Sequence, residues 1–178
     1  SVTSIRSYAF YGCSSLTSIT IPKSVTEISN DAFNSCSSLK NVVVSNKYCY
    51  DYFKESGISN IIVAVSNIEQ YEECKNQGIT DIIFNGSNAS ADGRCLIIDG
   101  ELVAFIAKGL TKYTMPHNVT KIGAGVFVNC DTLTSLTITN SATTFEPDTF
   151  DGCCNLTSLN INCNISKDYW PNCELSYV

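Results

Sequence analysis

The 178-residue chain is 44% hydrophobic and 16% charged, and its formal net charge is −6. Its 11 basic residues are scattered singly along the sequence, which argues against a nucleic-acid interface and against binding to an anionic membrane surface. The longest purely apolar run, 102–107, is far too short to span a membrane. A chain of this length can bury one substantial core.

One motif returns at intervals along the chain, at residues 5–21, 28–44, 122–138 and 145–161. Each copy has an apolar residue, then a residue pair whose second member is Phe, then a Cys, and then a Leu-x-x-apolar-x-apolar run. A fixed period of 20–30 residues is typical of solenoids, in which each repeat covers the apolar face of the next. Function is therefore to be sought on the surface of a stack of repeats.

The Leu-x-x-apolar-x-apolar runs of the first two copies occupy 16–21 and 39–44. Apolar and polar residues alternate there, which predicts strands with one buried face. Pro22 ends the first strand because proline has no amide to donate to a sheet. The small, polar residues between the strands predict short convex turns, and we expect Phe33 to be buried there beside Phe10 and Phe127 in one aromatic ladder.

The next two repeats are of another type, since 45–63 matches 66–84 without gaps at an offset of 21 residues. Gly57 and Gly78 stand where a helix ends in a left-handed residue. The pattern predicts helices at about 47–56 and 67–77, followed by strands at 58–63 and 79–84.

The period breaks after Phe84. Residues 85–93 are rich in Gly, Ser and Asn and indicate a loop. Residues 95–106 predict a hairpin that turns at Asp99-Gly100. The strand series resumes at 110–115. We therefore expect seven parallel strands in one sheet, beginning near Leu16, Leu39, Ile58, Ile79, Leu110, Leu133 and Leu156.

Three segments, 10–22, 32–39 and 119–123, resemble the BspA-type leucine-rich repeat, and the 92–106 hairpin is similar to an element common in that family. The resemblance is weakest at 45–84, where only the strands match. It implies a curved solenoid on secreted or cell-surface proteins of bacteria and some protists. It also implies adhesion, binding of host proteins, and no catalytic residues.

The fold class indicated is thus an α/β solenoid: a leucine-rich-repeat right-handed superhelix with a parallel concave sheet, short convex turns or helices, and one inserted β-hairpin. We interpret 1–178 as a single domain and as a fragment of a longer chain, because its first residues already lie inside a repeat. The repeats are assigned to 2–24, 25–44, 45–63, 64–84, 85–118 with the hairpin, 119–141 and 142–161, with a C-terminal cap at 162–178 that includes Trp170, Leu175 and Tyr177.

The ten cysteines do not indicate a disulfide framework throughout. Four of them stand one period apart in pairs, and equivalent residues of a stack point the same way, so we expect free, buried thiols at Cys13, Cys36, Cys130 and Cys153. Whether Cys154, Cys163 and Cys173 form a disulfide stays open.

Titratable residues give little sign of catalysis or metal binding. His117 is the only histidine and follows a proline, as a surface turn residue would. Asp92, Asp99 and Glu101 surround the hairpin but lack the spacing of a calcium loop. We expect no catalytic residues, no metal site and no cofactor.

The candidate binding site lies on the concave face, where alternate strand residues point. In three consecutive strands, the middle residue that points to this face is apolar, and the residue two positions before it is polar. The site is Val43, Ile62 and Ile83 side by side, rimmed by Asn41, Asn60 and Asp81. Two alternatives stay open: β-branched residues suit exposed strand positions, or domains absent from this fragment cover the surface.

These observations predict a non-catalytic interaction or adhesion module of a secreted or cell-surface protein. Its partner would be a protein, including a host extracellular protein, or a glycan. The alternative is a structural spacer or accessory repeat domain attached to another surface domain or to an enzyme.

Overall fold

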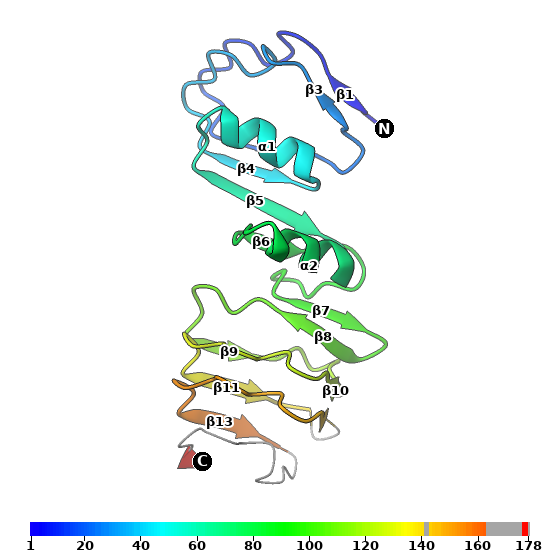
Figure 1. Cartoon of the computed structure of the whole chain (residues 1–178), viewed down its shortest axis with the longest axis vertical. Coiled ribbons are helices and arrows are strands. Elements are labelled where there is room, and N and C mark those ends of the chain that lie inside the picture. Colours follow the sequence, from blue (N-terminus) through cyan, green and yellow to red (C-terminus); the bar gives the residue numbers. More distant parts are fainter. Residues whose placement is uncertain (141–142, 163–175, 178) are drawn as a thin grey trace. The chain divides into compact units, whose positions relative to one another are not determined.

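The computed structural model describes residues 1–140, 143–162 and 176–177 (Figure 1). Cys163, Trp170, Cys173 and Leu175 lie outside the described residues, as do most of the expected C-terminal cap and the side chain of Tyr177. The chain divides into two compact units. The N-terminal unit comprises 1–65 and 69–83, and the C-terminal unit comprises 66–68 and 84–178.

The N-terminal unit is built on a parallel sheet with strand order β2-β4-β5-β6. Its strands are β2 (Ser18–Thr20), β4 (Asn41–Val44), β5 (Asn60–Val65) and β6 (Ile82–Phe84). A short parallel pair, β1 (Ser4–Ile5) and β3 (Glu27–Ile28), lies in the turns between strands. The two helices are α1 (Lys47–Glu55) and α2 (Ile68–Asn76).

The C-terminal unit holds two four-stranded sheets. One has the order β9-β11-β13-β14, with β9 (Lys112–Thr114), β11 (Ser135–Ile138), β13 (Ser158–Ile161) and β14 (Ser176–Tyr177), all paired in parallel. The other has the order β12-β10-β8-β7, with β7 (Cys95–Ile98), β8 (Glu101–Phe105), β10 (Lys121–Ile122) and β12 (Thr144–Phe145).

The seven expected strands are present, and the pairings β2-β4, β4-β5, β9-β11 and β11-β13 are parallel, as predicted. The expectation of one continuous sheet is wrong, because these strands belong to two different four-stranded sheets of the described structure. The chain between β6 and β9 forms the β7-β8 hairpin, and β8 pairs in parallel with β10, a short strand in the turns between repeat strands. The insertion thus extends the turn-side sheet.

The hairpin and the helices confirm local sequence signals. Asp99 and Gly100 have φ angles of 50° and 82°, the two positive values that a type I′ turn requires. Helix α1 begins after Asn46, whose side chain accepts a hydrogen bond from the Cys49 amide. It ends before Gly57, where the amides of Gly57 and Ile58 donate to the carbonyls of Lys54 and Phe53.

The pairing of β5 with β6 departs from the sequence alignment. The Val63 amide donates to the Asp81 carbonyl at 2.8 Å. In parallel pairing this bond places Ile82 opposite Val63, a spacing of 19 residues where the alignment predicts 21. The two additional residues, Ala64 and Val65, are apolar and buried, and they lengthen β5 instead of forming a loop.

The core contains two stacks of aromatic rings. In the N-terminal unit Phe33 stacks on Phe10, with ring centroids 4.8 Å apart, and also contacts Phe53. In the C-terminal unit Phe127 is fully buried and stacks on Phe150 with centroids 5.3 Å apart. The single expected ladder is therefore wrong: Phe127 belongs to the other unit, and Phe33 is only partly buried.

The cysteines of the repeat motif carry free thiols, and two of them link neighbouring repeats. The Cys36 thiol donates to the Phe10 carbonyl at 3.0 Å, and the Cys153 thiol donates to the Phe127 carbonyl at 2.8 Å. Cys130 and Cys153 are buried as expected, but Cys13 is exposed and Cys36 is only partly buried.

Candidate functional site

The side of the N-terminal sheet that faces away from the core is here called the open face. It carries Asn41 and Val43 from β4 and Asn60 and Ile62 from β5. The alternate residues of the same strands, Val42, Val44, Ile61 and Val63, are buried. This alternation follows from the pleat of a strand, which sends successive side chains to opposite faces.

Parallel pairing of β4 with β5 sets these residues in two rows. Val43 is opposite Ile62, and both are partly exposed. Asn41 is opposite Asn60, and the Asn60 carboxamide donates to the Asn41 side-chain oxygen. An apolar pair therefore lies next to a hydrogen-bonded pair of amides on one surface.

The last two predicted site residues lie elsewhere on this face than the alignment suggests. The bond from the Val63 amide to the Asp81 carbonyl places Asp81 opposite Ile62 and Ile83 opposite Ala64. Ile83 is thus two residues, about 6.6 Å, farther along the sheet than a row with Val43 and Ile62 requires. Asp81 is exposed and lies beside the apolar pair.

The corresponding positions of the C-terminal sheet have no apolar pair. The residues that match Asn41 and Val43 in the repeat are Lys112 and Thr114 on β9, Ser135 and Thr137 on β11, and Ser158 and Asn160 on β13, in register across the sheet. Every one of them is polar or charged. The apolar pair is therefore a feature of the N-terminal unit and not of the repeat itself.

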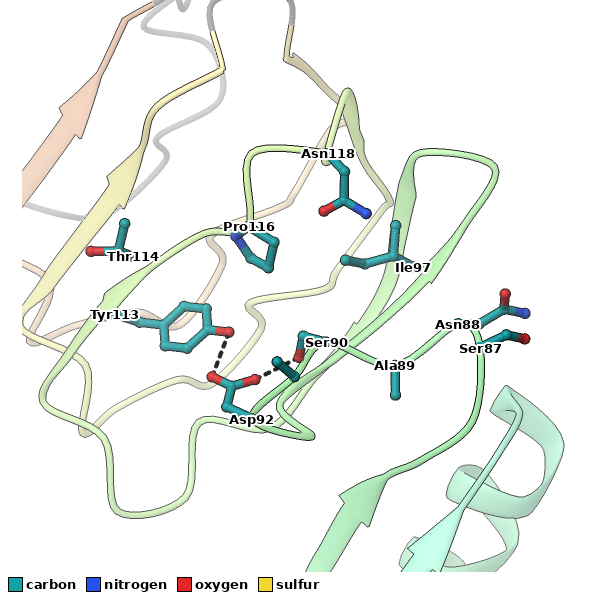
Figure 2. Close-up of a pocket in the computed structure, with 11 residues that line it drawn as sticks. Ser87, Asn88, Ala89, Ser90, Asp92, Ile97, Tyr113, Thr114, Pro116 and Asn118 are labelled. Carbon is teal, nitrogen blue, oxygen red and sulfur yellow. Dashed lines mark hydrogen bonds between the residues drawn. The ribbon is translucent and has the colours of Figure 1, made fainter.

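A second candidate site is a pocket of about 420 Å³ in the C-terminal unit, between the 87–92 loop, β7, and the segment from Tyr113 to Asn118 (Figure 2). Asp92 is one of its lining residues and is exposed. The carboxylate accepts hydrogen bonds from the Tyr113 hydroxyl at 2.9 Å and from the Ser90 hydroxyl at 2.6 Å. The Arg94 amide adds a third at 3.1 Å.

These hydrogen bonds and the burial of neighbouring groups shift the pKa values of Asp92, Tyr113 and Cys95. Partial burial opposes ionisation of Asp92, but the donors from Ser90, Arg94 and Tyr113 outweigh it and hold the pKa of Asp92 below its ordinary value. Burial, with the neighbouring Cys95 and Asp92, raises the pKa of Tyr113. Burial also raises the pKa of Cys95 to about 11. The pocket is thus lined by one carboxylate and one phenol, and the fully buried Cys95 lies behind the phenol, with its sulfur 3.3 Å from the Tyr113 hydroxyl.

The sequence does not predict this pocket, and it indicates only that Asp92 lacks the spacing of a calcium loop. The other two carboxylates named with it lie apart from the pocket: Asp99 is in the hairpin turn, and Glu101 forms an ion pair with Lys121 at 3.2 Å. His117 is exposed. Across residues 1–140, 143–162 and 176–177, no three His, Cys, Asp or Glu side chains come together as metal ligands would.

Within the same described ranges, no helix combines the length and apolar character needed to cross a bilayer. Both helices have nine residues and lie beside parallel strands. The parallel strands, one per repeat, and the Phe and Leu positions of each repeat define a leucine-rich-repeat protein.

The chain belongs to the BspA type leucine rich repeat family, whose model matches residues 1–96 and 101–174 in six copies. Among solved structures it is similar to a leucine-rich repeat protein from Bacteroides ovatus, at 18% identity and a TM-score of 0.32, over 90% of this chain and 59% of that one. It is also similar to a leucine rich cell surface protein from Faecalibacterium prausnitzii, at 18% identity and a TM-score of 0.33, over 95% of this chain and 53% of that one. The comparison with curated proteins found no match.

Proposed function

We propose that the protein is a non-catalytic binding module that acts outside the cell, at the cell surface or in secreted form, and that it binds a protein partner through the open face of its N-terminal unit. The contact surface comprises Val43 and Ile62 at the centre, Asn41 and Asn60 on one side, and Asp81 and Ile83 on β6. Membership of a leucine-rich-repeat family supports a role in protein interaction.

The observation that carries the proposal is the in-register, partly exposed pair Val43 and Ile62 on a face that is polar in the other unit. Protein interfaces commonly combine an apolar centre with a polar rim, and most of the binding energy comes from a few central residues. The amides of Asn41 and Asn60 are already fixed by their mutual hydrogen bond, so that ordering them on binding costs little entropy.

The second candidate function is a spacer that holds another domain away from a surface. The polar equivalents on β9, β11 and β13 favour it, because a face without an apolar centre gives a partner no anchor. The two functions can coexist in one chain, with the N-terminal unit binding and the C-terminal unit acting as the spacer.

The proposal is tested by immobilising the whole chain and exposing it to a panel of purified extracellular matrix proteins. Ile62→Asp places a charge at the centre of the contact and should weaken the retained interaction by a factor of about 100, the effect of losing a central apolar residue. Melting curves should be nearly unchanged, because the Ile62 side chain points away from the core.

A folded Ile62→Asp variant that binds as well as the parent would exclude the open face as the contact surface. If the parent itself retains no protein of the panel, the spacer function is favoured instead.

A further inference from the structure

We propose that the pocket above Asp92 binds one neutral pyranose ring, either as a free sugar or at the end of a glycan. The site lies wholly in the C-terminal unit and does not depend on the open face of the N-terminal unit. Its volume of about 420 Å³ is within the range of small-molecule sites and is sufficient for a single sugar ring.

The walls of the pocket are held in place by backbone hydrogen bonds. On one side, the Ser90 amide donates to the Cys95 carbonyl at 2.9 Å, and the Ile97 amide donates to the Asn88 carbonyl at 2.7 Å. The Ser90 hydroxyl oxygen also accepts from the Cys95 amide at 2.8 Å. The loop is therefore fixed to β7 before any ligand arrives, which lowers the entropic cost of binding.

The opposite wall, residues 116–119, is fixed by the following repeat. The Asn140 carboxamide donates to the carbonyls of His117 and Val119 at 3.1 and 3.0 Å. The Thr143 hydroxyl donates to the same Val119 carbonyl at 3.1 Å. Asn118 projects from this wall toward Ile97 and Pro116, as Figure 2 shows.

The polar groups match the hydroxyls of a sugar. The Asp92 carboxylate accepts hydrogen bonds from Ser90, Arg94 and Tyr113, and it is exposed, so a ligand hydroxyl can reach its oxygens. The Asn118 carboxamide supplies two donors and an acceptor. Ile97 and Pro116 form apolar walls between these groups, and the C–H face of a pyranose can pack on them.

Other ligand classes fit less well. The ionised Asp92 repels anions, and a calcium ion needs several oxygen ligands that one carboxylate does not provide. The Tyr113 ring packs against Phe105 at 4.8 Å, which limits its use as a platform for a planar base. A lone ammonium group would gain little from an exposed carboxylate that already accepts three hydrogen bonds.

The test measures binding of methyl pyranosides of glucose, galactose, mannose, fucose and N-acetylglucosamine to the full chain by saturation-transfer NMR and titration calorimetry. At least one should bind with a dissociation constant of about 1 mM, as expected for a ligand of this size. Its ring C–H protons should receive the strongest saturation, because they face Ile97 and Pro116. A glycan array that displays the same sugar at chain ends distinguishes a glycan terminus from a free sugar.

Asn118→Ala should weaken binding at least about tenfold without lowering the melting temperature, since its carboxamide is exposed. The matched control is Asn85→Ala. Asn85 is exposed at the start of the same loop and does not line the pocket, so this variant should bind as the parent does. Asp92→Asn is the second variant and should also weaken binding.

Three results would overturn the proposal: no methyl pyranoside binds, the Asn118→Ala and Asp92→Asn variants both keep parental affinity, or the cationic methyl glucosaminide binds in preference to every neutral sugar. The last would assign the pocket to an ammonium group.

Discussion

The two units use the same repeat for different surfaces. In the N-terminal unit, Val43 and Ile62 place branched apolar side chains on the open face. In the C-terminal unit, Thr114 and Thr137 occupy the equivalent row. The residues before and after Val43 and Ile62 are apolar and buried. On β11 the residues before and after Thr137, Leu136 and Ile138, are also apolar and buried. The core positions are thus similar in both units, whereas the open face is free to differ.

The two units also differ in how completely their repeats cover one another. Phe127 and Phe150 are fully buried and their rings are parallel to within 1°. Phe10 and Phe33 stack as closely, with rings parallel to within 4°, but both stay partly exposed. The two stacks thus share their ring geometry but differ in burial.

The largest expected difference between the units is in thiol reactivity. Cys13 is exposed, whereas Cys130 and Cys153 are buried. Alkylation of the native protein should modify Cys13 at least about 1,000 times faster than the two buried thiols, because buried groups react only after local opening. Mass spectrometry of samples taken over time measures these rates.

The unreduced, unfolded protein is the control, and there Cys13, Cys36, Cys130 and Cys153 should all be labelled. If Cys13 and Cys36, or Cys130 and Cys153, both resist labelling, the two form a disulfide. That result would contradict the assignment of free thiols to the repeat cysteines.

The next largest effect concerns the two aromatic stacks. Phe127→Ala should lower the free energy of unfolding by about 3–5 kcal/mol, as large-to-small changes in a core do. Phe33→Ala should cost about 2 kcal/mol, because a partly exposed ring has less buried area to lose. Calorimetric melting of both variants measures the difference. Equal losses would show that the two stacks are equally buried in solution.

A smaller effect is expected at two asparagines that bridge repeats in the same way. The Asn46 carboxamide donates to the Val25 carbonyl and accepts from the Cys49 amide, so it links two repeats and caps α1. Asn140 donates to the Val119 carbonyl in the C-terminal unit, and no helix begins beside it in the described chain. Both Asn→Ala variants should lose about 1 kcal/mol from the bridge.

Asn46→Ala should lose about 1 kcal/mol more, together with helical signal in circular dichroism, because the cap is lost as well. An unchanged circular dichroism spectrum for Asn46→Ala would show that α1 does not depend on this cap.

Local features of the fold could be predicted from the sequence because short-range chemistry decides them. The Asp99-Gly100 turn, the ends of the helices at Gly57 and Gly78, and the strands after each leucine depend on residues close in the chain. The division into two sheets could not be predicted, because it depends on which strand β8 pairs with, a long-range choice that the repeat pattern leaves open.

The candidate site shows the same limit. Alternation along each strand assigned Val43, Ile62 and Ile83 to one face. The position of Ile83 along that face depended on whether Ala64 and Val65 form a loop or extend β5. Because these two residues extend β5, the pairing follows the strand and not the alignment. The pocket at Asp92 was missed because it joins a loop to β9 through Tyr113, which is 21 residues away in the sequence.

The most direct test of the central claim compares the same substitution in the two units. Ile62→Asp and Thr137→Asp each add one negative charge at equivalent repeat positions, the first on β5 of the N-terminal sheet and the second on β11 of the C-terminal sheet. With a matrix protein that the parent binds, surface plasmon resonance should show that Ile62→Asp raises the dissociation constant at least about 30-fold, while Thr137→Asp changes it less than about threefold. Equal effects of the two substitutions, or a loss with Thr137→Asp alone, would contradict the assignment of binding to the N-terminal unit.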